Sequence, residues 1–197
     1  MKLELKIVDL LAKDIKKIFT INEIANTLEE FYSFVHRTVN RLNKDGVIIK
    51  NKAGKSYLCS LNLENEKTLA LLQLSEIEKR EKFYYANKEL KLILEDFVET
   101  VESHHKNTVA IVLFGSYAKG TATKESDIDI LLISKEKIEI EKITKEIYAK
   151  YGKEVIPITM ILNDFKKQKD MALIKEIMEN HYILYGVENF VKLVFGR

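Results

Sequence analysis

The chain has 197 residues, of which 46% are hydrophobic and 31% charged, so it can bury a core and remain soluble. Its 32 basic and 30 acidic side chains leave a net charge of +2, which favours no particular class of partner. The single cysteine, Cys59, excludes an internal disulfide and a cysteine-cluster zinc site, as is typical of a reducing cytosol.

No segment approaches the roughly eighteen apolar residues of a membrane span. The first residues, Met1–Glu4, carry charges and lack the pattern of a signal peptide. We therefore expect a cytoplasmic protein with no membrane partner. Its length suits two small domains joined by a connector.

Three short helices are expected near the amino terminus. Apolar side chains recur at helical spacing over Lys6–Phe19. Thr20 can cap a second helix over Ile21–Leu28, with Glu23 at the third position as in a capping box. A third helix is predicted over Ser33–Lys44.

A β-hairpin is predicted after these helices. Val47–Lys50 and Ser56–Ser60 have strand composition, and the glycine-containing segment Asn51–Lys55 between them is the expected turn. Three helices followed by a hairpin are the order of a winged helix-turn-helix. Residues 1–64 accordingly resemble archaeal and bacterial winged-helix regulators.

Basic side chains concentrate on the third helix and the hairpin. Between Phe31 and Ser60, six Lys or Arg residues accompany one acid, Asp45. Such a surface would contact the phosphates of duplex DNA; the alternative is a positive face that docks on the second domain or on a partner protein. The candidate nucleic-acid-binding residues are His36, Arg37, Asn40, Arg41, Lys44, Lys52 and Lys55.

The middle of the chain is predicted to be helical. Neither glycine nor proline occurs over Asn65–Lys106, where apolar side chains recur at helical spacing. We expect a charged connector through Lys82 and an amphipathic helix before the next strand. The predicted domains are residues 1–64, a helical connector over 65–88, and a catalytic domain over 89–197.

The C-terminal part is organised around two apolar runs. Val109–Phe114 is an unbroken apolar run, predicted as a buried strand that ends at a glycine. The second run begins with Asp127-Ile128-Asp129. Because side chains alternate faces in a strand, both carboxylates project the same way, about 7 Å apart. Two hard anions on one face suit a divalent cation.

The turn between the two runs suits phosphate. Gly115 lets the backbone approach a ligand closely. Ser116 offers a hydroxyl and an amide at the expected start of a short helix over Tyr117–Gly120, where anions are favoured.

The spacing of these residues resembles the signature of the DNA polymerase β-like nucleotidyltransferases, which is Gly-Ser, about ten residues, and then Asp-x-Asp. The stretch G-S-Y-A-K-G-T-A-T-K-E-S-D-I-D-I-L-L is similar to the minimal branch of that family, and the resemblance covers Val109–Gly186. It implies a small mixed sheet flanked by helices and a two-metal Mg²⁺ site on Asp127 and Asp129. It also implies a nucleoside triphosphate substrate, ATP by analogy, with its phosphates at Gly115 and Ser116.

Two further polar residues near the signature are candidates for nucleotide binding. Lys119 could reach a phosphate or face solvent, and Ser126 could hold the loop by bonding local backbone.

The family normally adds a third carboxylate from a neighbouring strand, which binds a metal and helps to deprotonate the attacking hydroxyl. In the strand predicted over Glu154–Leu162, the expected position is occupied by Ile156. Glu154 is the candidate replacement, one pleat away. Asn163 is predicted to cap a last long helix over Asp164–Glu179.

The sequence thus predicts an α+β chain that transfers a nucleoside monophosphate, by analogy AMP, to a hydroxyl of a small acceptor or a partner protein such as a toxin. The alternative is a DNA-binding regulator, or an antitoxin, whose nucleotidyltransferase domain is degenerate and only binds nucleotide.

Overall fold

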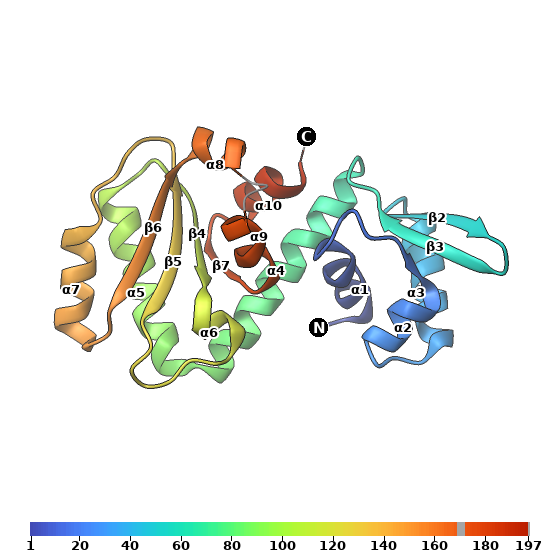
Figure 1. Ribbon diagram of the computed structural model, residues 1–197, viewed down its shortest axis with the longest axis horizontal. Coiled ribbons are helices and arrows are strands. Elements are labelled where there is room, and N and C mark those ends of the chain that lie inside the picture. Colours follow the sequence, from blue (N-terminus) through green and yellow to red (C-terminus); the bar gives the residue numbers. More distant parts are fainter. Residues whose placement is uncertain (169–171, 197) are drawn as a thin grey trace. The chain divides into compact units, whose positions relative to one another are not determined.

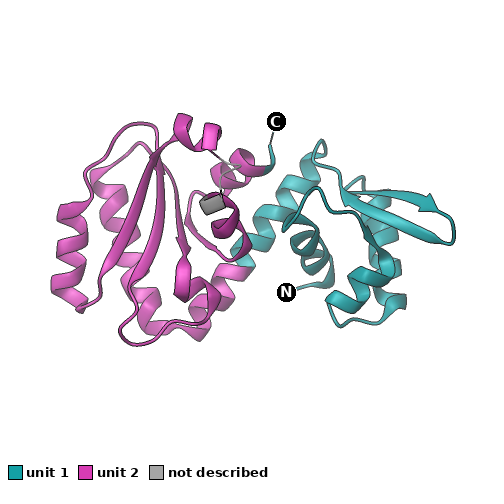
Figure 2. Ribbon diagram, viewed as in Figure 1, with its two compact units in different colours: residues 1–78, 195–197 teal, residues 79–194 magenta. Residues whose placement is uncertain are grey.

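The computed structural model describes residues 1–168 and 172–196, and it divides into two compact units (Figure 2). The first contains Met1–Glu78 with the last residues from Phe195, and the second contains Lys79–Val194. The domain boundaries predicted from the sequence stay a prediction.

The first unit combines helices with a three-stranded antiparallel sheet of order β1-β3-β2 (Figure 1). Its elements are α1 (Leu3–Ala12), β1 (Phe19–Thr20), α2 (Ile21–Thr27), α3 (Tyr32–Lys44), β2 (Ile48–Ala53), β3 (Ser56–Leu61) and the first part of α4 (Glu66–Ala86). The first helix ends earlier than predicted, because Ile15 and Ile18 are exposed and continue no buried stripe. The three helices and the hairpin occur in the predicted order, and the winged-helix resemblance itself stays a prediction.

Local sequence signals account for two elements of this unit. Thr20 accepts a hydrogen bond from the backbone N–H of Glu23 at 3.2 Å, and the Glu23 carboxylate accepts one from the backbone N–H of Thr20 at 2.6 Å, which confirms the capping box. The hairpin turn is shorter than predicted, because β2 continues to Ala53 and only Gly54 and Lys55 separate the strands.

The second unit is built on a four-stranded mixed sheet of order β6-β5-β4-β7. Its strands are β4 (Thr108–Phe114), β5 (Ile128–Ser134), β6 (Val155–Ile161) and β7 (Tyr182–Tyr185). Strand β4 is antiparallel to β5 and β7, and β5 is parallel to β6. The mixed sheet flanked by helices agrees with the predicted α+β class.

Helices cover both faces of this sheet, with α5 and α7 on one side and α9 and α10 on the other (Figure 1). The helices are α5 (Lys88–His104), α6 (Gly115–Lys119), α7 (Glu141–Tyr151), α8 (Leu162–Gln168), α9 (Ala172–Glu179) and α10 (Val187–Phe195). Alternate strand residues such as Ile111 and Ile130 are fully buried in one core with Phe97 of α5 and Ile147 of α7. The side chains between them in β5 therefore face the other way.

The predicted last helix differs from the structure at its start. Helix α8 begins at Leu162, so Asn163 lies inside the helix and does not cap it. The prediction also covers residues 169–171, which lie outside the described residues. Among the helices that the structure describes, none is both long and apolar enough to cross a membrane.

Candidate functional site

The two aspartates of the signature lie at the beginning of β5. Asp129 is the second residue of the strand and Asp127 directly precedes it, with Ile128 fully buried between them. Because Ile128 belongs to the core with α5 and α7, alternation directs both carboxylates to the opposite side of the sheet. The pair therefore sits together at one end of the central strands.

Gly115 gives the adjoining turn its shape. It follows Phe114, the β4 residue paired with Asp129, and has a φ of +70°. A Cβ at this position would lie 1.9 Å from Oδ2 and 2.9 Å from Cβ of Asp129. Only glycine fits both the left-handed backbone and the close approach of the carboxylate.

Ser116 contacts the same carboxylate through its backbone. Helix α6 begins at Gly115, two residues before the predicted start, and the Ser116 N–H donates a hydrogen bond to Asp129. Burial raises the pKa of Asp129, and the nearby charge of Asp127 raises that pKa further. The Ser116 N–H and the Lys119 charge oppose this rise. Two carboxylates in mutual repulsion are a site at which a cation would relieve electrostatic strain.

The donor set fits Mg²⁺ bound together with a substrate. Mg²⁺ is usually held by about one or two carboxylates plus waters and substrate phosphates, not by an all-protein cage. Within residues 1–168 and 172–196, no group of three or more His, Cys, Asp or Glu side chains is arranged to hold a metal ion. Asp127 and Asp129 are thus the protein's candidate contribution.

Lys119 has an ion-pair partner across the site. Its Nζ lies 2.7 Å from Oε1 of Glu176 in α9, and this hydrogen bond is the main reason that the pKa of Lys119 is raised. The charge of Asp129 contributes in the same direction. Lys119 is therefore near enough to Asp129 for their charges to interact while it is paired with Glu176.

Ser126 shapes the loop that precedes the carboxylates. Its Oγ accepts a hydrogen bond from the backbone N–H of Thr123 at 2.8 Å. The Tyr117 hydroxyl donates to the Ser126 carbonyl at 3.4 Å. Local bonding of the loop, anticipated from the sequence, is what the structure shows for this serine.

The pairing of β5 with β6 shows where Ile156 and Glu154, the two positions considered for a third carboxylate, lie relative to the aspartates. Ile156 of β6 is paired with Asp129 and is 42% exposed. Glu154 comes just before β6, is exposed, and accepts a hydrogen bond on its carbonyl from the Ile128 N–H at 2.9 Å. This register brings Glu154 level with Asp127, but the three acids do not form a ligand group among the described residues.

The candidate nucleic-acid-binding residues of the first unit fall into two groups. Four of them have partners within the unit: Asn40 contacts the His36 ring at 3.3 Å, Arg41 forms an ion pair with Glu4, and Arg37 contacts an aromatic ring. The guanidinium of Arg37 lies over the Phe34 ring at 5.1 Å. The lysines are exposed on the end of α3 and on the hairpin; they are Lys44, Lys52 and Lys55.

Sequence reasoning missed an aromatic group beside Arg37. Phe31, Tyr32 and Phe34 are 76%, 51% and 47% exposed at the start of α3. Their side chains lie off the buried stripe of the helix, and counting basic residues alone did not identify them.

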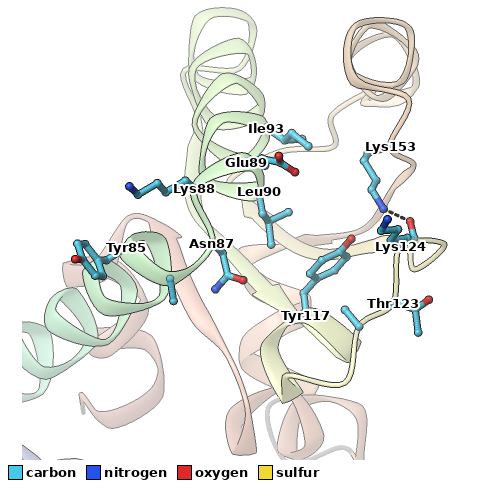
Figure 3. Close-up of a pocket in the computed structure, with 12 residues that line it drawn as sticks. Tyr85, Asn87, Lys88, Glu89, Leu90, Ile93, Tyr117, Thr123, Lys124 and Lys153 are labelled. Atoms are coloured by element: carbon cyan, nitrogen blue, oxygen red, sulfur yellow. Dashed lines mark hydrogen bonds between the residues drawn. The ribbon is translucent and has the colours of Figure 1, made fainter.

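Sequence reasoning also missed a contact that fastens the loop before β5. The Nζ of Lys153 donates a hydrogen bond to the backbone carbonyl of Lys124 and lies 5.9 Å from the centre of the Tyr117 ring (Figure 3). Lys153 lies 29 residues from Lys124 in the sequence, so no local pattern predicts that they meet.

The chain is similar to a known protein family. The nucleotidyltransferase domain family model matches residues 94–185. A crystal structure of a toxin-antitoxin with AMP-PNP aligns with a TM-score of 0.42 and 17% identity, over 51% of this chain and 79% of that chain.

Relatives found by sequence have a higher identity to this chain than that structure has. Three proteins of Methanocaldococcus jannaschii, each named "putative protein adenylyltransferase", are 32%, 33% and 34% identical over 119, 95 and 103 residues. The matches cover 56%, 47% and 49% of this chain and 81%, 94% and 94% of the respective relatives. On the extent and identity of these matches, the chain belongs to the nucleotidyltransferase domain family.

Proposed function

We propose that the second unit is a magnesium-dependent nucleotidyltransferase that moves AMP from ATP to a hydroxyl group of a protein. The observation that carries the proposal is the arrangement of Asp127 and Asp129 on one side of β5, against the Gly115–Ser116 turn. This arrangement supports a proposed phosphate site next to a proposed cation site. The protein acceptor and the adenine base are inferred from the names of the relatives.

The chemistry needs position and charge more than covalent participation. The acceptor oxygen attacks the α-phosphorus, the bond from that phosphorus to the β-phosphate oxygen breaks, and pyrophosphate leaves. Gly115 and Ser116 would hold the triphosphate against the backbone, and Asp127 and Asp129 would hold Mg²⁺. When bound, Mg²⁺ supplies charge neutralisation for the phosphate oxygens.

Two residues have proposed supporting roles. Glu154 would accept the proton of the attacking hydroxyl, because it lies level with Asp127 in the adjoining chain segment. Lys119 would contact a phosphate after leaving Glu176. A two-metal site would require Glu154 or the substrate to complete the ligands.

Transfer of label from ATP labelled at the α-phosphate tests the proposal directly. The protein is incubated with Mg²⁺ and with proteins from a cell lysate, and labelled protein is separated by gel electrophoresis. We expect a labelled band that disappears in the double variant Asp127→Asn with Asp129→Asn. Label that is absent from every protein with the wild-type chain would contradict the enzymatic proposal and leave the nucleotide-binding alternative.

A matched control has the same change in charge away from the site. Glu141→Gln with Glu146→Gln removes two exposed carboxylates from α7. This control should transfer label at the wild-type rate, so that loss in the aspartate variant cannot be assigned to net charge.

We also propose that the first unit binds duplex DNA through α3 and the hairpin. The supporting observation is the exposure of Arg37, Lys44, Lys52 and Lys55 on these two elements. Exposed lysine and arginine side chains can neutralise backbone phosphates without sequence readout. The alternative is that the same surface docks on a partner protein such as a toxin.

A further inference from the structure

A cavity of about 740 Å³ lies within the second unit, between the start of α5 and the loop that follows α6 (Figure 3). Leu90 and Ile93 of α5 line it together with Tyr117 of α6, and Lys124 and Lys153 line its other side. Neither Asp127 nor Asp129 is among the lining residues. The cavity is therefore separate from the carboxylate site, although α6 contributes to both.

The lining combines apolar side chains of α5, one acid of the same helix, Glu89, and lysines on the other side. Leu90 and Ile93 are each 8% exposed, and the half-buried Tyr117 ring extends toward the cavity beside them (Figure 3). Opposite them, the Lys153 ammonium is held by the Lys124 carbonyl, and the Lys124 side chain itself is exposed. An aromatic face next to ammonium groups suits a planar ring that carries phosphate.

Asn87 adds a side-chain amide that can form a hydrogen bond with the edge of a bound ring. Its Nδ2 donates to the Phe83 carbonyl at 2.9 Å, which fixes the side chain at the cavity. The carboxamide oxygen is the end that lies toward Tyr117 in Figure 3. An amide oxygen accepts a hydrogen bond from an amino group such as that of a nucleobase.

We propose that this cavity is a second, metal-independent binding site for a nucleoside di- or triphosphate. The ring lies against Tyr117 and Leu90, and the phosphates lie against Lys124 and Lys153. A volume near 740 Å³ is in the range of about 300–1,000 Å³ that is usual for small-ligand sites. The proposal does not depend on the transferase activity.

Occupancy of the cavity would be sensed at the carboxylates through α6. Tyr117 lines the cavity, and the preceding residue, Ser116, donates its N–H to Asp129. A ligand that shifts the Tyr117 ring therefore acts on the helix whose first turn positions the carboxylate. The inferred role is regulation by nucleotide.

Calorimetric titration of the full chain with ADP in excess EDTA tests the site. Without a divalent cation the carboxylates repel the phosphates, so binding at the signature is suppressed. We expect saturable ADP binding that is retained in Asp127→Asn with Asp129→Asn and at least tenfold weaker in Lys124→Glu. Lys142→Glu is the matched control, because it reverses the charge of an exposed lysine in α7, and it should bind ADP as the wild type does.

Inorganic tripolyphosphate separates a nucleotide site from a general anion site. It carries more charge than ADP and no ring, so a site that uses Tyr117 and Leu90 should bind ADP at least tenfold more tightly. Equal or tighter binding of tripolyphosphate would overturn the nucleotide assignment. Undetectable ADP binding, loss of binding in the aspartate variant, or wild-type binding by Lys124→Glu would overturn the site itself.

Discussion

Gly115 lies so close to Asp129 that a side chain at position 115 would overlap the aspartate. A Cβ on Gly115 would lie 1.9 Å from Oδ2 and 2.6 Å from Cγ of Asp129. Because even the Asp129 Cβ would be only 2.9 Å away, rotation of the carboxylate cannot relieve the overlap, and the strands must separate. The glycine of the signature thus allows the close approach of the Asp129 carboxylate.

Gly115→Ala should therefore abolish transfer and destabilise the second unit. Displacement of a catalytic group by about 1 Å can cost on the order of 100-fold in rate. Gly120→Ala is the matched control, because Gly120 has the same φ of +70° and open space around its added Cβ. The control should lose only about 1–2 kcal/mol of unfolding free energy, which is the cost of a left-handed backbone at alanine, and it should retain transfer. Urea unfolding measures this loss. Equal activity in the two variants would contradict the steric account.

Ile156 offers a test of how complete the carboxylate site is. It is paired with Asp129 across β5 and β6 and is 42% exposed, so a polar side chain there buries no new charge. Ile156→Asp should add a third carboxylate beside Asp129 and lower the Mg²⁺ concentration needed for half-maximal transfer, by about 3- to 10-fold on the basis of ligand charge. Thr159→Asp is the control, since Thr159 is also exposed on β6 but is paired with Leu132.

The opposite outcome would identify Glu154 as the third acid. If Ile156→Asp leaves the Mg²⁺ dependence unchanged while Glu154→Gln reduces transfer, the exposed acid before β6 already serves the site. If neither variant changes the Mg²⁺ dependence or the rate, the site works with two carboxylates and the substrate.

The sequence predicts what depends on neighbours along the chain. The capping box at Thr20 and the strand that ends at Gly115 were predictable, because each depends on a few consecutive residues. The pairing of Ile156 with Asp129 was not predictable with certainty, since register is set by packing between distant segments. Likewise, a helical pattern over Asp164–Glu179 does not show that α8 begins at Leu162. For the same reason the cavity beside Tyr117 left no signal in the sequence.

The ion pair between Lys119 and Glu176 should affect affinity for the triphosphate. Its Nζ–Oε1 distance is 2.7 Å, and both side chains are largely exposed, so the pair can open. If Lys119 contacts a phosphate during transfer, Lys119→Ala should raise KM for ATP about 10-fold, the usual loss for one charge-assisted hydrogen bond. Glu176→Gln should lower KM, because the lysine is released.

Glu179→Gln is the control for charge in the same helix, since Glu179 only influences Lys119 at a distance. It should change KM less than Glu176→Gln does. A higher KM in Glu176→Gln would show instead that the pair holds α9 in a conformation needed for substrate binding.

Asp96 and Lys150 link the two helices on one face of the sheet, with Nζ and Oδ2 2.6 Å apart. The hydrogen bond from Lys150 holds the pKa of Asp96 below its usual value. A carboxyl with a lowered pKa in the folded state adds stability above its unfolded pKa, and this is lost as pH falls through the folded pKa. Asp96→Asn should therefore cost about 0.5 kcal/mol in urea unfolding at pH 7, and this cost should disappear as the pH falls through the lowered pKa of Asp96.

Lys150→Met should show the same loss at pH 7, and Lys145→Met, on the same helix, should not. The double variant with both Asp96→Asn and Lys150→Met should lose less unfolding free energy than the two single variants lose together, because each single change already removes the one shared interaction. A loss in Asp96→Asn that persists at low pH would contradict an ionic origin.

DNA binding by the first unit should follow the charge of α3 and the hairpin. Arg41 is paired with Glu4, so Arg37 and Lys52 are better probes of phosphate contact. Each lost contact should reduce the slope of log affinity against log salt by about 0.9. Fluorescence anisotropy with a labelled random-sequence duplex at several salt concentrations measures this slope, which should fall by about 2 in Arg37→Ala with Lys52→Ala.

Lys13→Ala with Lys16→Ala is the matched control, because it removes the same charge from an exposed turn after α1. It should leave the slope unchanged. If the wild-type chain does not bind duplex DNA, or if both double variants change the slope equally, the basic surface does not contact DNA as proposed. The exposed side chains of Phe31, Tyr32 and Phe34 would then favour a protein partner, because aromatic and arginine side chains are enriched in protein interfaces.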